Sequence, residues 1–457
     1  MNDRQLAAAR PVQQGRPPVS SARARVMTGS WWQELVASVE WTPGYLAFLY
    51  YMFVVVTYWL PGADIAIIAA MVALLLRPQD WRMCPFLWIF AAFAAWCLVS
   101  YSTTSYKSVS WLQTNAVLKM WLIAFTAYNV VRTRAQLRFF LAFAILCFVL
   151  FPTRGALVNY FGGYSVWGRA LWNFAYANPN DLAAFALPYA SMACALFFIV
   201  RNRLLKLASL GAIGLLLMLI FFTQSRGAML AAGAVGAVVM FANRRNPRVL
   251  MGGVGLALAA AFVAPKGSFD RLLALAGASA STGFKGADKE GSAEQRYQLL
   301  TVSVAVASDN RVFGVGPGAY AFVHGTYANA MRGELPMAAG NRDPHNTVMR
   351  TFAETGLPGL GLFVAMVVVA WIRAYAIQRK LKPRDPVIRF LSFGLLAFMI
   401  AGLFGSFTYL NVLYLQLAML EVAMALAIPT AARTMPVVSA RPRHPRAALR
   451  RASLQGM

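Results

Sequence analysis

The stretch LLKLASLGAIGLLLMLIFFTQSRGAMLAAGAVGAVVMFA, residues 204–242, decides the fold class of this chain. It consists of two predominantly apolar runs that are separated only by the short polar turn Gln224-Ser225-Arg226-Gly227. Apolar runs of this length are typical of helices that cross a lipid bilayer. The stretch therefore predicts a helical hairpin in a membrane.

The composition of the whole chain agrees with this prediction. Hydrophobic residues make up 59% of the 457 residues and charged residues only 13%, which excludes a soluble globular protein of this size. The sequence predicts an all-α polytopic membrane protein with about 12 transmembrane helices. The predicted spans are residues 45–60, 62–76, 84–100, 115–131, 137–152, 181–200, 204–222, 227–242, 248–265, 351–372, 388–406 and 408–428.

These spans divide the chain into five parts. They are an Arg-rich tail with an interfacial segment (1–44), spans one to nine (45–265), a long loop (266–350), spans ten to twelve (351–428) and a basic tail (429–457). The first 30 residues contain arginines but no apolar core, so we expect a disordered tail and no signal peptide. Three tryptophans that follow are expected to anchor the chain at the membrane interface: Trp31, Trp32 and Trp41.

The distribution of Lys and Arg predicts the orientation in the membrane. A basic cluster follows every even-numbered span, as in Arg132, Arg134 and Arg138 after span four. By the positive-inside rule, both termini are cytoplasmic and the loop 266–350 is periplasmic, in a bacterial inner (plasma) membrane. This topology and the attraction to anionic membrane lipids account for most of the net charge of +26, so we expect no nucleic-acid partner.

Several arginines fall on the predicted outer side, where topology does not require them. A single arginine at an interface is usually a lipid-headgroup anchor, but several on one side favour a polyanionic ligand. Guanidinium groups bind phosphate oxygens through bidentate, charge-assisted hydrogen bonds, so the simplest ligand is a phosphate or pyrophosphate. These arginines are Arg154, Arg169, Arg226, Arg271, Arg296, Arg311, Arg332, Arg342 and Arg350.

His345 lies in the segment Asp343-Pro344-His345-Asn346, at the mouth of the predicted span 351–372. The flanking Arg342 and Arg350 favour the neutral imidazole, which is the form that accepts a proton. This pattern predicts a general base beside an anion site; the alternative is a helix-capping loop with an incidental histidine. Asp343 either orients the imidazole or caps the next helix.

Three features of the long loop predict its structure. The polar stretch Gly277–Ser292 is expected to be flexible, and Glu294–Ala307 to form an amphipathic or half-buried helix on the membrane, with Arg296 on its first turn. Gly314-Val315-Gly316-Pro317-Gly318 is interpreted as a tight turn that folds the loop back onto the spans. A phosphate cradle is the weaker alternative, because no strand precedes the turn.

The acidic residues of the loop are scattered, which disfavours a metal site. Cys84, Cys97, Cys147 and Cys194 fall within predicted spans and are interpreted as packing residues, not as disulfides. Glu421 lies deep in the last span, where it either has a function or, as we prefer, pairs with a polar neighbour.

Together these motifs resemble the O-antigen ligase (WaaL) and O-antigen polymerase (Wzy) superfamily over about residues 150–375. The resemblance rests on the order and the sidedness of Gln224-Ser225-Arg226-Gly227, Arg296, Gly314-Val315-Gly316, His345-Asn346 and Glu354-Thr355-Gly356-Leu357-Pro358-Gly359. Two further segments, Arg77-Pro78-Gln79-Asp80 and Asn178-Pro179-Asn180-Asp181, resemble pieces of the ligase-like branch.

The resemblance implies a membrane-embedded (GT-C-like), inverting glycosyltransferase that needs neither a metal nor another cofactor. Its donor would be an undecaprenyl-pyrophosphate-linked glycan and its acceptor a hydroxyl of lipid A-core, on the periplasmic face. His345 would be the general base, while Arg226 and Arg296 would bind the pyrophosphate. Residues in possible supporting roles are Arg154, Arg169, Asp343, Asn346, Arg342 and Arg350. We expect the loop 266–350 to fold back and gather Arg226, Arg296 and His345 around one cavity that is open to lipid.

Two alternatives remain. An O-antigen polymerase or a protein O-oligosaccharyltransferase would use the same donor, although the Ser-Arg-Gly turn and a single late outer loop with His-Asn favour a ligase. A 12-span secondary transporter belongs to another class, and it is expected to show two similar halves joined by a long cytoplasmic connection. Here the connection at 201–204 is short and the long loop is on the outer side.

Overall fold

The computed structural model describes residues 30–242, 244–245, 247, 251–255, 262 and 292–428. Within this part the chain is helical, with one isolated bridge between Val166 and Arg169 and no named strand. Most of the predicted span 248–265, the loop stretch Gly277–Gly291 and the tails 1–29 and 429–457 lie outside the described residues.

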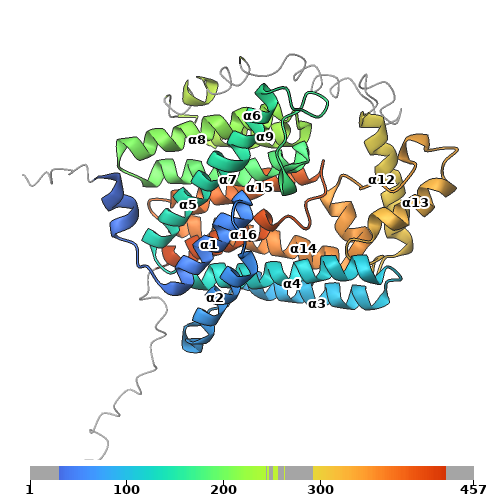
Figure 1. Cartoon of the computed structure of the whole chain (residues 1–457), viewed down its shortest axis with the longest axis horizontal. Helices are drawn as coiled ribbons and strands as arrows, with labels where there is room; N and C mark the ends of the chain where they lie inside the picture. The colour runs from blue at the N-terminus through green and yellow to red at the C-terminus, as the bar shows by residue number, and fades with distance from the viewer. Residues whose placement is uncertain are drawn as a thin grey trace, which may run out of the picture.

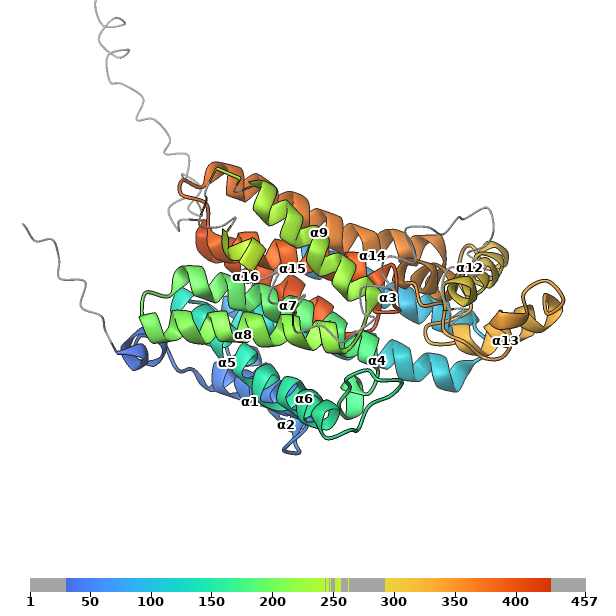
Figure 2. The same cartoon turned by 90° about the horizontal axis from the view of Figure 1, so that it is seen from above.

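A helix is found at each of the other eleven predicted spans. The membrane-type helices are α1 (Pro43–Thr57), α2 (Ala63–Leu75), α3 (Pro85–Thr103), α4 (Lys107–Val130), α5 (Arg134–Phe148), α7 (Pro179–Ile199), α8 (Arg203–Phe222), α9 (Arg226–Ala242), α14 (Thr347–Lys380), α15 (Pro386–Gly402) and α16 (Asn411–Ala427). The long helices run side by side, and the loop helices α12 (Ser292–Asp309) and α13 (Tyr320–Ala330) lie at one end of the bundle (Figures 1 and 2).

Not all of these helices are long enough to cross a bilayer alone. Among the described residues, five are long and apolar enough: Pro85–Thr103, Arg134–Phe161, Pro179–Ile199, Arg203–Phe222 and Thr347–Lys380. Helix α2 has only 13 residues, about 20 Å at a rise of about 1.5 Å per residue, whereas the hydrocarbon core is about 30 Å thick. Helix α2 is therefore too short to cross the core alone, and the full span over 62–76 stays a prediction. The all-helical, polytopic architecture agrees with the prediction, and the count of twelve spans stays a prediction.

Local signals explain where the helices begin. Thr133 and Gln136 form a capping box at the start of α5, in which each side chain bonds the other residue's backbone. Asn202 caps α8, and Asp385 caps α15. Proline occupies the first position of α1, α3, α7 and α15, where its missing N–H leaves no helical hydrogen bond unmade.

Helices α7 and α15 form the centre of the bundle. They approach closely at Gly394, where an added Cβ would lie 2.1 Å from the Ser191 hydroxyl oxygen. Gln416 of α16 joins this contact, because its amide donates to Ser191 at 3.2 Å and to the Leu391 carbonyl at 2.8 Å. Small and polar residues at such crossings bring membrane helices together where the hydrophobic effect does not.

The turns between helices gather at two opposite ends of the bundle. At the first, which we call the η1 end after the short helix η1 (Gln33–Ala37), Glu34 accepts hydrogen bonds from the backbone N–H groups of Arg201 and Asn202 at 2.7 and 2.8 Å. Arg134 pairs with Asp385 there at 2.9 Å. The segments joined here are those that carry the predicted cytoplasmic basic clusters.

The opposite end, which we call the α12 end, joins the predicted outer segments. The ring of Tyr58, after α1, stacks on Phe174 with centroids 4.6 Å apart. Helices α12 and α13 have their own small apolar cluster there, which includes Leu299, Val302 and Tyr320. The prediction of a helix over Glu294–Ala307 is confirmed by α12, which runs across the direction of the long helices (Figure 1).

The glycine turn at 314–318 docks this loop onto the bundle, as predicted. Gly314, Gly316 and Gly318 all have positive φ angles, of 71°, 103° and 78°. The hydroxyl of Thr104, just after α3, donates to the carbonyl of Val315. A Cβ at Gly316 would lie 2.7 Å from Thr104, so only glycine permits this approach.

Helix α14 is broken at Gly356, whose φ is 67°. The break frees backbone groups, and the docked loop binds them: Val315 N–H donates to the Ala353 carbonyl at 2.9 Å and Leu357 N–H to the Arg311 carbonyl at 2.7 Å. Trp96 of α3 donates its indole N–H to the Thr355 carbonyl at 2.7 Å. The Glu354–Gly359 motif thus separates a short first part of α14, residues 347–355, from the long apolar remainder.

Candidate active site

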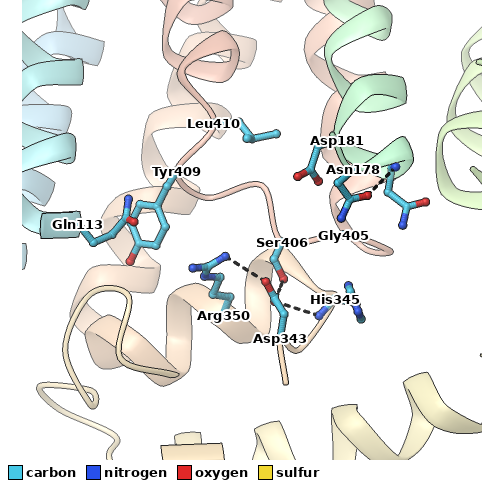
Figure 3. A pocket seen from close by; sticks show the side chains of 11 residues that line it. Gln113, Asn178, Asp181, Asp343, His345, Arg350, Gly405, Ser406, Tyr409 and Leu410 are labelled. Atoms are coloured by element: carbon cyan, nitrogen blue, oxygen red, sulfur yellow. Dashed lines mark hydrogen bonds and ion pairs between the residues drawn. The ribbon is translucent and has the colours of Figure 1, made fainter. Parts of the chain in front are cut away.

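A cavity of about 200 Å³ opens at the α12 end (Figure 3). Its walls come from four separate segments: the start of α4, the start of α7, the start of α14 and the link between α15 and α16. The lining residues are Gln113, Asn178, Asn180, Asp181, Asp343, His345, Arg350, Gly405, Ser406, Tyr409 and Leu410. Most of them are polar, which suits a hydrophilic ligand.

The backbone around His345 fixes the position of its ring. His345 has a φ of 50°, a left-handed conformation that is uncommon for a residue with a side chain. Its N–H donates to Asp343 Oδ1 at 3.3 Å. The next residue, Asn346, caps α14 by accepting from Met349 N–H at 3.0 Å and donates to the Leu403 carbonyl at 3.1 Å. His345 is therefore held at the junction of loop and helix.

Asp343 does not cap α14, and its hydrogen bond reaches the backbone of His345 and not the imidazole ring. Its carboxylate accepts from the backbone of His345 and from the Ser406 hydroxyl, and it pairs with Arg350 at 3.2 Å. The cap of α14 is Asn346 instead. Asp343 thus ties the His345 loop to the link between α15 and α16.

Arg350 lies at the centre of an ion-pair network. It pairs with Asp343 and, at 3.3 Å, with Glu354, and its guanidinium lies 5.0 Å from the centre of the Tyr409 ring. Tyr409 donates its hydroxyl to the second oxygen of Glu354, which is fully buried. Because two carboxylates compensate its charge, we infer that Arg350 stabilises the arrangement of these side chains and does not bind a ligand.

The surroundings lower the pKa of His345. Burial is the largest cause, and the positive charges of Arg296, Arg342 and Arg350 act in the same direction, while Asp343 opposes them. The arginines thus favour the neutral imidazole, as predicted, although burial contributes more. The effect of Arg296 shows that α12 brings its first turn within electrostatic range of His345.

The start of α7 forms the wall opposite His345. Asn178 accepts from Asn180 N–H at 2.8 Å, and Asn180 Oδ1 accepts from Arg169 at 2.6 Å. Arg169 also donates to the Thr223 carbonyl at 2.7 Å, so it connects α7 to the end of α8. Asp181 makes no hydrogen bond or ion pair with any described residue, and Figure 3 shows its side chain on the cavity side of α7.

Arg226 is the first residue of α9 and does not line the cavity. The next residue, Gly227, packs against Phe404: an added Cβ would lie 2.7 Å from the Cβ of Phe404. Phe404 directly precedes Gly405 and Ser406 of the cavity wall. Arg154 and Arg342 are both exposed and do not line the cavity.

Several residues of the site were not recognised from the sequence. Ser406 was placed at the end of the predicted span 388–406 and Tyr409 at the start of the predicted span 408–428, and Gln113 lies in the first turns of α4. None of them stands in a pattern that indicates a site. Glu354 and Asp181 do belong to segments that resemble family motifs, but no role was assigned to either.

Comparison with known proteins supports the resemblance. Residues 211–364 match the family model described as O-antigen ligase. The matched region runs from α8 into α14 and includes Arg226, Arg296 and His345. No curated protein matches the chain. The match over residues 211–364 thus supports a place for this chain in the O-antigen ligase/polymerase superfamily.

Proposed function

We propose that this protein is an O-antigen ligase that transfers a glycan from undecaprenyl pyrophosphate to a hydroxyl of lipid A-core, on the periplasmic face of the bacterial inner membrane. One observation carries the proposal: His345, with a lowered pKa, lines a polar cavity at one end of an apolar helical bundle, inside the matched domain. A neutral imidazole accepts a proton at physiological pH.

The proposed reaction is a single displacement. The oxygen of the acceptor hydroxyl attacks the anomeric carbon of the donor glycan, and His345 takes the proton of that hydroxyl. The bond between the anomeric carbon and the pyrophosphate oxygen breaks, and its electron pair leaves with undecaprenyl pyrophosphate. Attack opposite the leaving group inverts the anomeric centre.

Arg226 and Arg296 are proposed to bind the pyrophosphate. Guanidinium groups stabilise the negative charge that develops on a departing phosphate, so an acid that protonates the leaving group is not required. The contact of Gly227 with Phe404 and the effect of Arg296 on His345 support this assignment. In this proposal Asp343 and Arg350 position His345 and do not bind the donor.

The test is glycan transfer by the purified protein in liposomes that contain the lipid-linked donor and lipid A-core. His345→Ala is expected to lower the transfer rate by about 10²-fold to 10⁴-fold, the usual contribution of a general base, without loss of donor binding. His444→Ala, which removes a histidine outside the matched region, is the control.

Near-normal transfer by His345→Ala would overturn the role of His345. The product decides between ligase and polymerase: glycan on lipid A-core supports the proposal, whereas glycan extended only on a second lipid-linked glycan contradicts it.

A further inference from the structure

The carboxylate of Asp181 is the one acidic group of the cavity wall that the described residues leave without a partner. Asp343, the other carboxylate of that wall, is compensated by Arg350 and accepts from Ser406. Asp181 has no hydrogen bond or ion pair with any described residue, although it is only partly exposed. Removing a carboxylate from water without a partner is unfavourable, and burial accordingly raises the pKa of Asp181 to about 6. A ligand that donates hydrogen bonds to this carboxylate relieves that cost.

The neighbours of Asp181 are suited to a sugar. Asn178 and Asn180 stand beside it on the same wall, and the oxygens of both amides are already occupied by protein donors. Their NH₂ groups remain to donate hydrogen bonds, while Asp181 can only accept them. Neighbouring donors and acceptors match vicinal hydroxyl groups, each of which both donates and accepts.

The position of Asp181 relates it to the acceptor and not to the pyrophosphate. It shares the cavity with His345, which in the proposed reaction contacts the acceptor hydroxyl. The volume of about 200 Å³ is below the ~300 Å³ of typical small-molecule pockets and suits a single sugar ring. Arg226 and Arg296 do not line this cavity, which leaves the pyrophosphate to the region beside it.

We propose that Asp181 binds hydroxyl groups of the acceptor sugar and makes the site selective for an uncharged ring over an acidic one. This inference rests on the proposed function and names the class of its acceptor: a sugar with neighbouring free hydroxyls and no carboxylate or phosphate at the ring that enters the cavity. An acidic ring would face the charge of Asp181, which has no ion-pair partner among the described residues, at short range, where solvent screens it poorly.

The experiment compares two synthetic acceptors that differ only in the terminal ring, a hexose or the corresponding hexuronic acid. With Asp181→Asn, the KM for the hexose acceptor is expected to rise about tenfold or more, the effect of losing a hydrogen bond to a charged group. The kcat is expected to change much less. The preference for the hexose over the hexuronic acid, as a ratio of kcat/KM values, is expected to fall about tenfold because the repulsion is gone.

Two further variants control the result. Asp309→Asn makes the same chemical change at the exposed end of α12, outside the cavity, and is expected to leave both KM values unchanged. Asp181→Glu keeps the charge, so it is expected to keep the preference for the uncharged ring even if its KM changes.

An Asp181→Asn variant with an unchanged preference overturns the inference. That outcome includes a variant whose kcat falls equally for both acceptors, which indicates a structural role. The two proposals fail separately. If His345→Ala keeps its activity, the proposed function fails; if only His345→Ala loses activity and Asp181→Asn behaves as the parent protein, only the role of Asp181 fails.

Discussion

The two ends of the helical bundle use charge differently. At the η1 end, Glu34 is bound by backbone N–H groups, and Arg134 and Asp385 pair with each other. At the α12 end, Asp181 and the ring of His345 face a cavity. Charged side chains that pair with other groups of the protein hold helices together, whereas charged side chains without such a partner are available to bind a ligand. The number of charged residues in a segment does not distinguish these cases.

Arg373 and Glu421 offer the strongest test that paired charge is structural. Arg373 of α14 contacts both oxygens of Glu421 of α16 at 2.6 Å, and the Glu421 side chain is only 1% exposed. Arg373→Met would leave a buried carboxylate without its partner, which is expected to destabilise the protein by about 3 kcal/mol. Thermal inactivation of the purified protein in detergent measures this loss.

Transfer per folded molecule is expected to be unchanged in Arg373→Met, because neither Arg373 nor Glu421 lines the cavity. The double variant Arg373→Met with Glu421→Leu is expected to recover most of the stability, since it leaves no buried charge. A double variant as unstable as the single one would contradict this account.

The helices and one buried ion pair could be predicted from the sequence, but most of the residues that line the cavity could not. The long apolar runs predicted the helices because burial in lipid imposes helical structure on any such run. Glu421 was expected to pair with a polar neighbour, and Arg373 confirms this. The site was predicted only where its residues are adjacent in sequence, as in Asp343 and His345. Asp181 and Tyr409 join it through contacts between helices that no local pattern encodes.

Substitutions of Arg226 and Arg296 test the α12 end, and their effect on transfer is expected to be of intermediate size. Replacing either by Ala is expected to raise the transition-state free energy by about 1.5 to 3 kcal/mol, the scale of a charge-assisted hydrogen bond. Lys at either position is expected to restore activity only in part, because an ammonium group cannot form the bidentate contact. The measurement is kcat/KM for the lipid-linked donor.

Arg332→Ala is the control for these variants, since Arg332 is exposed and does not line the cavity. Full activity with Lys at both positions would show that these arginines only anchor lipid headgroups.

The smallest expected effect concerns the pH dependence of transfer. His345 is active as a base only when neutral, and its pKa lies below the usual value of about 6.5, so the rate is expected to rise with pH and to be half-maximal below about pH 6.5. Arg342→Gln removes a positive charge that lowers this pKa. The pKa should therefore rise, and the variant should lose activity near pH 6 and match the parent protein at pH 8.

Arg332→Gln serves as the charge-matched control for this profile. An Arg342→Gln variant whose profile is identical to that of the parent protein would show that His345 is not the group that titrates.

The break in α14 at Gly356 has a consequence for how the protein is made. The carbonyls of residues 353–355 accept hydrogen bonds from Trp96 and Ser100 of α3 and from the glycine turn at 314–318. During synthesis α3 emerges first, the loop much later and α14 last. It follows that these carbonyls stay unsatisfied until all three segments have met, and unsatisfied carbonyls near lipid are costly. Completion of α14 and closure of the α12 end are thus one event of biogenesis, which links formation of the cavity to the correct insertion of the chain.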